Sequence, residues 1–147
     1  MSFIPPKEYK KILSRVAIPC VDIVIHVKGK FLLHKRTNYP VKGKWWVPGG
    51  RIYLGEKTEK AVLRKAREET GMKVRIEKFL GVQETIFNRG PFGIGKMHTI
   101  NMQYLVKPVN GKFQVKLDSQ ASEYKIFGKI EKSWHPYVKD IIRKSRY

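Results

Sequence analysis

The sequence of 147 residues contains a single cysteine, Cys20, and this scarcity excludes two classes of small domain. One cysteine cannot form an internal disulfide, and it cannot supply a zinc cluster built on cysteine thiolates. Long apolar runs are also missing, because the most apolar stretch, Cys20–Val27, is short and carries Asp22 and His26. Prolines and charges occupy Met1–Lys11, where a signal peptide needs an apolar run. We therefore expect a cytoplasmic protein with no membrane partner.

Acidic residues are scarce as well, with 12 Asp and Glu against 31 Lys and Arg, for a formal charge of +19. One interpretation is an anionic partner such as nucleic acid, and the other is a solvated, Lys-rich surface. The lysines are spread from Lys7 to Lys144 without a long basic block, which favours the solvated surface. Apolar residues make up 41% of the chain, a level typical of a globular protein. The length fits a single domain over residues 1–147.

The hydrophobic pattern predicts a mixture of strands and helices. Helices are expected over Glu8–Val16, Thr58–Thr70 and Trp134–Lys144. Strands are expected over Cys20–Val27, Phe31–Thr37, Trp45–Val47, Val74–Leu80, Thr99–Val106 and Phe113–Leu117, with Tyr124–Ile130 as a further extended segment. Thr58–Thr70 is the clearest helix, because good helix formers fill it and Gly71 follows where a left-handed C-cap is expected. The mixture predicts a layered α/β domain.

One segment carries the chemistry. A glycine-rich turn, Pro48–Gly50, leads through a loop into the Thr58–Thr70 helix, whose last turn contains Glu68 and Glu69. Arg64 and Glu68 are four residues apart, so they share a helix face. A hard cation such as Mg2+ prefers oxygen ligands and keeps waters and substrate phosphates in its shell. Because glycines let main-chain oxygens approach closely, the segment predicts a divalent cation beside a phosphorylated ligand.

This segment resembles the Nudix box. The residues in register with that box are Gly50, Glu56, Arg64, Glu68, Glu69, Gly71 and Met72, with Ala66 at the first aliphatic position. Lys65 departs from it, because the family has a glutamate there that often assists as base or metal ligand. The resemblance implies a Nudix-type α/β/α sandwich with a mixed sheet, and a hydrolase that uses Mg2+, with Mn2+ as an alternative ion.

The preceding residues are similar to the GDP-mannose mannosyl hydrolase branch of that family. The matching motifs are Val21-Asp22-Ile23-Val24, Gly29-Lys30-Phe31-Leu32-Leu33, Lys35-Arg36-Thr37-Asn38 and Gly43-Lys44-Trp45-Trp46-Val47-Pro48-Gly49-Gly50-Arg51. The branch removes the sugar at its anomeric carbon and leaves GDP, and it also lacks the box glutamate at the position of Lys65. It is dimeric, which implies a homodimer here.

The resemblance implies a role for each of several residues. Mg2+ would be held by the Gly49 carbonyl, Glu69 and Gln120, with Glu68 also at the metal. Arg36 and Arg51 would contact the diphosphate, whose oxygens match the paired donors of a guanidinium. The expected catalytic set is Arg36, Arg51, Arg64 and Glu68, with Arg64 as the orienting group. Phe3, Tyr9 and Asp22 would lie near the substrate.

The general base is open, because the branch has a histidine where this chain has Ala121. Glu123, Glu84 and His98 are substitute candidates. Three functions follow from this: hydrolysis of a nucleoside diphosphate sugar, with GDP-mannose favoured; phosphorus–oxygen cleavage of another nucleoside diphosphate derivative; or a catalytically impaired module that binds nucleotide or RNA. The glycine-rich loop Asn88–Lys96 either covers bound substrate or only connects two strands.

Overall fold

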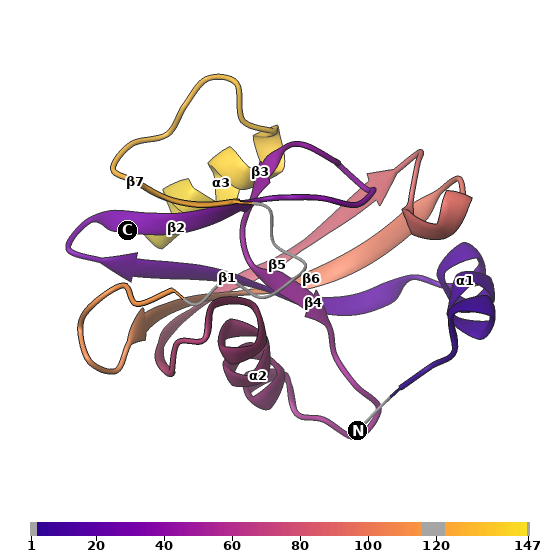
Figure 1. The fold of residues 1–147 in the computed structure, drawn as a ribbon, viewed down its shortest axis with the longest axis horizontal. Helices are drawn as coiled ribbons and strands as arrows, with labels where there is room; N and C mark the ends of the chain where they lie inside the picture. The colour runs from indigo at the N-terminus through magenta and orange to yellow at the C-terminus, as the bar shows by residue number, and fades with distance from the viewer. Residues whose placement is uncertain (1–2, 116–122, 147) are drawn as a thin grey trace.

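A mixed β-sheet organises the chain, with helices on both of its faces (Figure 1). The computed structural model describes residues 3–115 and 123–146. In chain order the elements are α1 (Pro6–Arg15), β1 (Ile18–Val27), β2 (Lys30–Lys35), β3 (Trp45–Trp46), β4 (Gly49–Arg51), α2 (Thr58–Thr70), β5 (Val74–Phe87), the short 3-10 helix η1 (Pro91–Gly93), β6 (Met97–Pro108), β7 (Glu123–Phe127) and α3 (Pro136–Ser145).

β1 is the central strand of the sheet. The strand order is β3-β2-β1-β6-β5, while β4 pairs with β1 and β7 pairs with β2. β1 runs parallel to β6, from the Ile18–Thr99 pair to the Ile25–Val106 pair, and every other pairing is antiparallel. The β-branched residues that predicted this strand are buried on both faces of the sheet, as a strand covered on both sides requires.

Alternate residues of β1 point to different helices. Val21, Ile23 and Ile25 belong to the core that includes α2, whereas Val24 belongs to the core that includes α3. Figure 1 shows α2 and α3 on opposite sides of the sheet, with α1 at one end. The predicted α/β/α sandwich with a mixed sheet is therefore confirmed. In the described ranges, no helix has the length and apolar character needed to cross a membrane.

Local signals predicted the helices better than the strands. α2 has the predicted bounds, and Gly71 caps it with φ 74° and an N–H that donates to the Arg67 carbonyl. β5 runs on to Phe87, beyond the predicted end at Leu80, because it pairs with β6 along its whole length. The prediction of a strand over Phe113–Leu117 is wrong for residues 113–115, which are irregular, and its last two residues lie outside the described ranges.

Candidate functional site

Two glycines of β4 let three elements meet at the site. A Cβ atom on Gly49 would lie 2.3 Å from the Val21 carbonyl oxygen and 2.4 Å from Oδ1 of Asp22. A Cβ on Gly50 would lie 2.6 Å from Cε of Lys65 on α2. The sequence did not predict β4 as a strand, because glycines have low strand propensity. β4 forms through its pairing with β1, at Gly49–Asp22, Gly50–Val21 and Arg51–Cys20.

Glu68 and Glu69 both contact the ammonium group of Lys65. The Gly49 N–H donates to Oε2 of Glu69 at 3.0 Å. Nζ of Lys65 lies 3.4 Å from Oε1 of Glu69 and 3.5 Å from Oε2 of Glu68. Burial raises the pKa of Glu69, and the neighbouring Lys65 charge opposes that rise. The two carboxylates therefore share one positively charged side chain beside the glycine bend.

Arg64 joins the loop after β4 to the helix. Its Nε donates to Glu56 at 2.7 Å, its Nη1 to Glu68 at 3.1 Å, and its Nη2 to the Arg51 carbonyl at 3.0 Å. The hydrogen bond from Arg64 lowers the pKa of Glu56. The Arg64 guanidinium also lies 3.7 Å from the centre of the Tyr53 ring, and the Arg51 guanidinium lies 4.6 Å from the same ring. Arg64 thus positions both Glu68 and the strand that carries Arg51.

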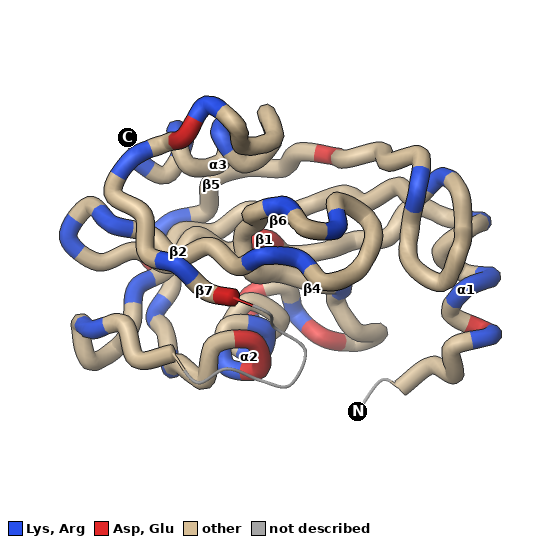
Figure 2. Tube along the Cα trace, turned by 45° about the horizontal axis from the view of Figure 1, so that its top comes forward, with Lys and Arg blue, Asp and Glu red and all other residues tan. Residues whose placement is uncertain are grey.

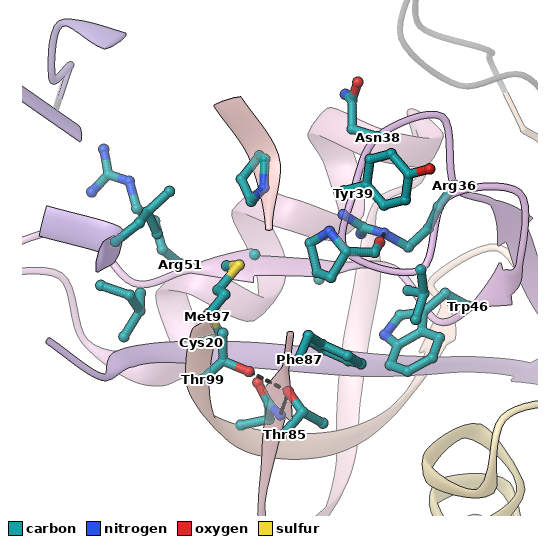
Figure 3. A pocket seen from close by; sticks show the side chains of 18 of the residues that line it. Cys20, Arg36, Asn38, Tyr39, Trp46, Arg51, Thr85, Phe87, Met97 and Thr99 are labelled. Atoms are coloured by element: carbon teal, nitrogen blue, oxygen red, sulfur yellow. Dashed lines mark hydrogen bonds between the residues drawn. The ribbon is translucent and has the colours of Figure 1, made fainter. Parts of the chain in front are cut away.

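A cavity of about 290 Å³ lies on the other side of the glycine bend. Gly49 and Gly50 form part of its wall, together with Arg36 and Arg51. In Figure 3 these two arginines lie on opposite sides of the cavity. Nε of Arg36 donates to the Pro40 carbonyl at 2.8 Å. Burial lowers the pKa of Arg36, and the negative charge of Glu69 counteracts this, so the two sides of the bend are electrostatically linked.

The cavity has a neutral polar floor, which we define as Thr85, Thr99 and Asn101. The two threonine hydroxyls are 2.6 Å apart, and Nδ2 of Asn101 donates to the Thr85 hydroxyl at 3.5 Å (Figure 3). All three residues are buried. Tyr9 and Phe92 supply an aromatic wall, with ring centres 6.3 Å apart. The cavity therefore offers hydroxyl, amide and ring surfaces next to two guanidinium groups.

Asp22 lines the same cavity and is 7% exposed. The Tyr137 hydroxyl of α3 donates to Oδ2 of Asp22 at 2.5 Å, and Nε2 of Gln103 donates to that hydroxyl at 3.0 Å. Burial raises the pKa of Asp22 to about 7, against the lowering effect of the Tyr137 hydrogen bond. Asp22 is thus anchored to α3, the helix that packs on the same face of the sheet as the Asp22 side chain.

Several expected residues do not join this site. Phe3 is 74% exposed and does not line the cavity. Gln120 and Ala121 lie outside the described residues. Of the candidate bases, Glu84 and His98 bind each other at 2.9 Å. They alternate along β5 and β6 with Thr85 and Thr99, which line the cavity, so they lie on the opposite face of the sheet.

Glu123 is the third candidate base, and it does not line the cavity either. It pairs with Lys35 in the register of β7 and β2, and the two charged groups are 3.9 Å apart. Arg36 follows directly after Lys35. Within residues 3–115 and 123–146, no three His, Cys, Asp or Glu side chains converge to hold a metal ion. A cation at Glu69 would therefore need main-chain oxygens, waters or substrate oxygens as further ligands.

The sequence pattern did not identify the polar floor or Tyr137 as parts of the site. The only available signal was the alternation of Thr99, Asn101 and Gln103, which puts three polar side chains on one face of an otherwise apolar strand. That pattern is also typical of a strand with one solvated face. Only the covering elements show that this face is buried around a cavity.

Comparison with known proteins matches residues 15–139 to the family model described as NUDIX domain. A glycan biosynthesis protein, Agl8 of Haloferax volcanii, is 35% identical over 136 residues, which cover 92% of this chain and 86% of that protein. An ADP-ribose pyrophosphatase of Methanocaldococcus jannaschii is 35% identical over 104 residues, covering 71% of this chain and 59% of the relative. The MutT NUDIX hydrolase structure from Burkholderia pseudomallei superposes with a TM-score of 0.70 at 23% identity, over 88% and 98% of the two chains.

Proposed function

The chain belongs to the Nudix hydrolase family, and from that premise we propose that it hydrolyses a nucleoside diphosphate sugar with the help of Mg2+. The main support for this proposal is that Arg36 and Arg51 line the same cavity as Gly49, whose N–H donates a hydrogen bond to Glu69. Two guanidiniums and a carboxylate cluster on either side of one glycine bend can neutralise a diphosphate and its counter-ion together.

The residues present fit a hard divalent cation. Glu69 is only 19% exposed and already faces the positive charge of Lys65, and its neighbour Gly49 offers a main-chain carbonyl. Glu69 and that carbonyl would hold Mg2+, or Mn2+ as an alternative, with the charge of Glu68 beside them; Gln120, the remaining expected ligand, lies outside the described residues. When bound, the ion would act as a Lewis acid on the diphosphate oxygens.

The arginines would perform the rest of the phosphate chemistry. Arg36 and Arg51 would each donate paired hydrogen bonds to the diphosphate and stabilise its negative charge as it leaves. Arg64 would keep Arg51 and Glu68 in place through the hydrogen bonds described above. A fixed arrangement of donors lowers the barrier because it needs no reorganisation during the reaction.

The cavity supports a sugar nucleotide in particular. Its neutral polar floor suits sugar hydroxyls, which need donors and acceptors without a net charge. Tyr9 and Phe92 suit a nucleobase or sugar ring. GDP-mannose is the leading candidate because of the resemblance of Val21–Arg51 to the mannosyl hydrolase branch, and a relative named for glycan biosynthesis is compatible with a sugar substrate.

The second candidate is phosphorus–oxygen cleavage of a compound such as ADP-ribose. It is supported by the relative named ADP-ribose pyrophosphatase and by Ala121, which stands where the mannosyl hydrolase branch has its histidine. A module that binds RNA is disfavoured, because Figure 2 shows Lys and Arg spread over strands, helices and loops instead of forming one stripe. The homodimer and the cytoplasmic location stay predictions.

Hydrolysis in 18O-labelled water separates the two reactions. Purified protein would be incubated with Mg2+ and either GDP-mannose or ADP-ribose, and the products would be identified by mass spectrometry. We expect GDP without label and mannose with label, because water attacks the anomeric carbon. Label in GMP or in mannose 1-phosphate would instead establish phosphorus–oxygen cleavage.

A matched pair of variants tests where the diphosphate binds. Arg36→Met should abolish turnover of either substrate, whereas Arg67→Met, on the exposed side of α2, should not change it. Lack of turnover of every sugar nucleotide by the folded wild-type protein, with salt-sensitive RNA binding instead, would overturn the proposal.

A further inference from the structure

Lys65 stands where the box has a glutamate, and the proposed function gives this lysine no role. It stands on α2 three residues before Glu68 and four before Glu69, so all three side chains lie on one side of the helix. Its side chain is 19% exposed. The methylene stem lies over Gly50, where a Cβ would approach Cε to 2.6 Å. The glycine bend therefore accommodates the Lys65 side chain and directs its ammonium group into the cluster.

The ammonium group divides the carboxylate cluster into two parts. Oε2 of Glu69 faces the Gly49 N–H at 3.0 Å, while Oε1 lies 3.4 Å from Nζ of Lys65. Glu68 contacts two cations, Lys65 at 3.5 Å and Arg64 at 3.1 Å. The negative charge of Glu68 is therefore matched by side chains of the protein. Glu69, on the Gly49 side, keeps the position suited to an added divalent ion.

We propose that Lys65 is a resident cation of the box, which takes the place of a divalent ion beside Glu68 and limits the protein to one divalent ion per chain. This inference rests on the proposed function, since it concerns the same carboxylates. A fixed charge within hydrogen-bonding distance of Glu69 also repels a divalent ion bound to that carboxylate.

Direct counting of bound Mn2+ tests this without measuring activity. Free Mn2+ is titrated by its electron paramagnetic resonance signal, with no substrate present. Wild type should bind one Mn2+ per chain. Lys65→Met keeps the stem over Gly50 but removes the charge, so its affinity for Mn2+ should rise on the order of tenfold. Lys65→Glu places a third carboxylate beside Glu68 and Glu69, so it should bind two Mn2+ per chain.

Lys60→Met is the matched control, because Lys60 lies on the exposed side of the same helix and the substitution makes the same change of charge. It should leave the Mn2+ affinity within twofold of the wild-type value. Thermal unfolding of each metal-free protein checks that the variants are folded.

Three results would count against the proposal. Two Mn2+ ions per wild-type chain would overturn it, as would equal affinities of Lys65→Met and Lys60→Met. In both cases the proposed Mg2+-dependent function would stand. Failure of every folded protein to bind Mn2+ would overturn this inference and the proposed metal site together.

Discussion

The two sides of the glycine bend differ in both chemistry and origin. On the α2 side the cluster of Arg64, Lys65, Glu68 and Glu69 is charged, and all four residues come from one helix. On the cavity side the polar floor is neutral, and its residues come from β5 and β6. The difference indicates that one helix assembles the carboxylate cluster, whereas strands distant in sequence assemble the neutral floor of the cavity.

The same contrast holds for one carboxylate on each side of the bend, Glu69 and Asp22. Burial raises the pKa of both Glu69 and Asp22. Glu69 is partnered by the Lys65 charge, which favours its anionic form, while Asp22 is partnered by the neutral Tyr137 hydroxyl. We infer that Glu69 is suited to hold a cation, and that Asp22 serves to anchor β1 to α3 at the cavity wall.

Replacing Glu69 should give the largest effect, and it tests the charged side directly. Glu69→Gln keeps an oxygen that can accept from the Gly49 N–H but removes the charge, so kcat/KM should fall by about 10²–10³-fold. Steady-state hydrolysis at saturating Mg2+ measures this. Glu59→Gln, exposed at the start of the same helix, is the control. Retention of more than about a tenth of the activity would contradict a cation site at Glu69.

The pH dependence of stability tests the neutral side. The pKa of Asp22 is raised to about 7 in the folded protein, above its ordinary value of about 3.9. The folded state therefore holds the proton more tightly, and stability should fall as the pH rises from about 4 to about 7. Asp22→Asn should remove that fall and be more stable than wild type at about pH 8, by on the order of 2–4 kcal/mol. Urea unfolding of the metal-free proteins measures both slopes, and parallel slopes would be inconsistent with a buried, protonated Asp22.

Arg64 contributes to the stability of the fold as well as to the charged side of the bend. Arg64→Met removes donors to Glu56, Glu68 and the Arg51 carbonyl, so the free energy of unfolding should fall by about 2 kcal/mol. Chemical denaturation measures this, with Arg67→Met as the exposed control on the same helix. Equal stabilities of the two variants would show that the Arg64 network has no structural role.

The smallest effect is expected at the polar floor. Thr99→Val removes one hydroxyl of the Thr85–Thr99 pair, and KM for a sugar nucleotide should rise about fivefold while kcat changes little. Ser14→Val, at an exposed position of α1, should leave KM unchanged. If KM for the sugar nucleotide does not respond to Thr99→Val, the floor does not contact the substrate.

Much of the charged side was predictable because its determinants are local. The bounds of α2 followed from helix formers and the Gly71 cap, and a shared helix face placed Arg64 beside Glu68 before any tertiary contact was known. The contact of Lys65 with both glutamates follows from the same spacing. Identifying the bend as a strand did not follow, because glycines lack strand propensity and β4 exists only through its pairing with β1.

The resemblance of Gly50–Met72 to the Nudix box predicted the family, and hydrophobic periodicity predicted the layered fold and the charged helix, because both signals lie in residues close together in the sequence. The face of β5 and β6 that lines the cavity followed only from how the chain packs in three dimensions. This packing separated Thr85 and Thr99, which lie at the cavity, from Glu84 and His98, which do not. The reason is physical: strand alternation yields two equivalent faces, and the helix and loops that pack against them determine which one is enclosed.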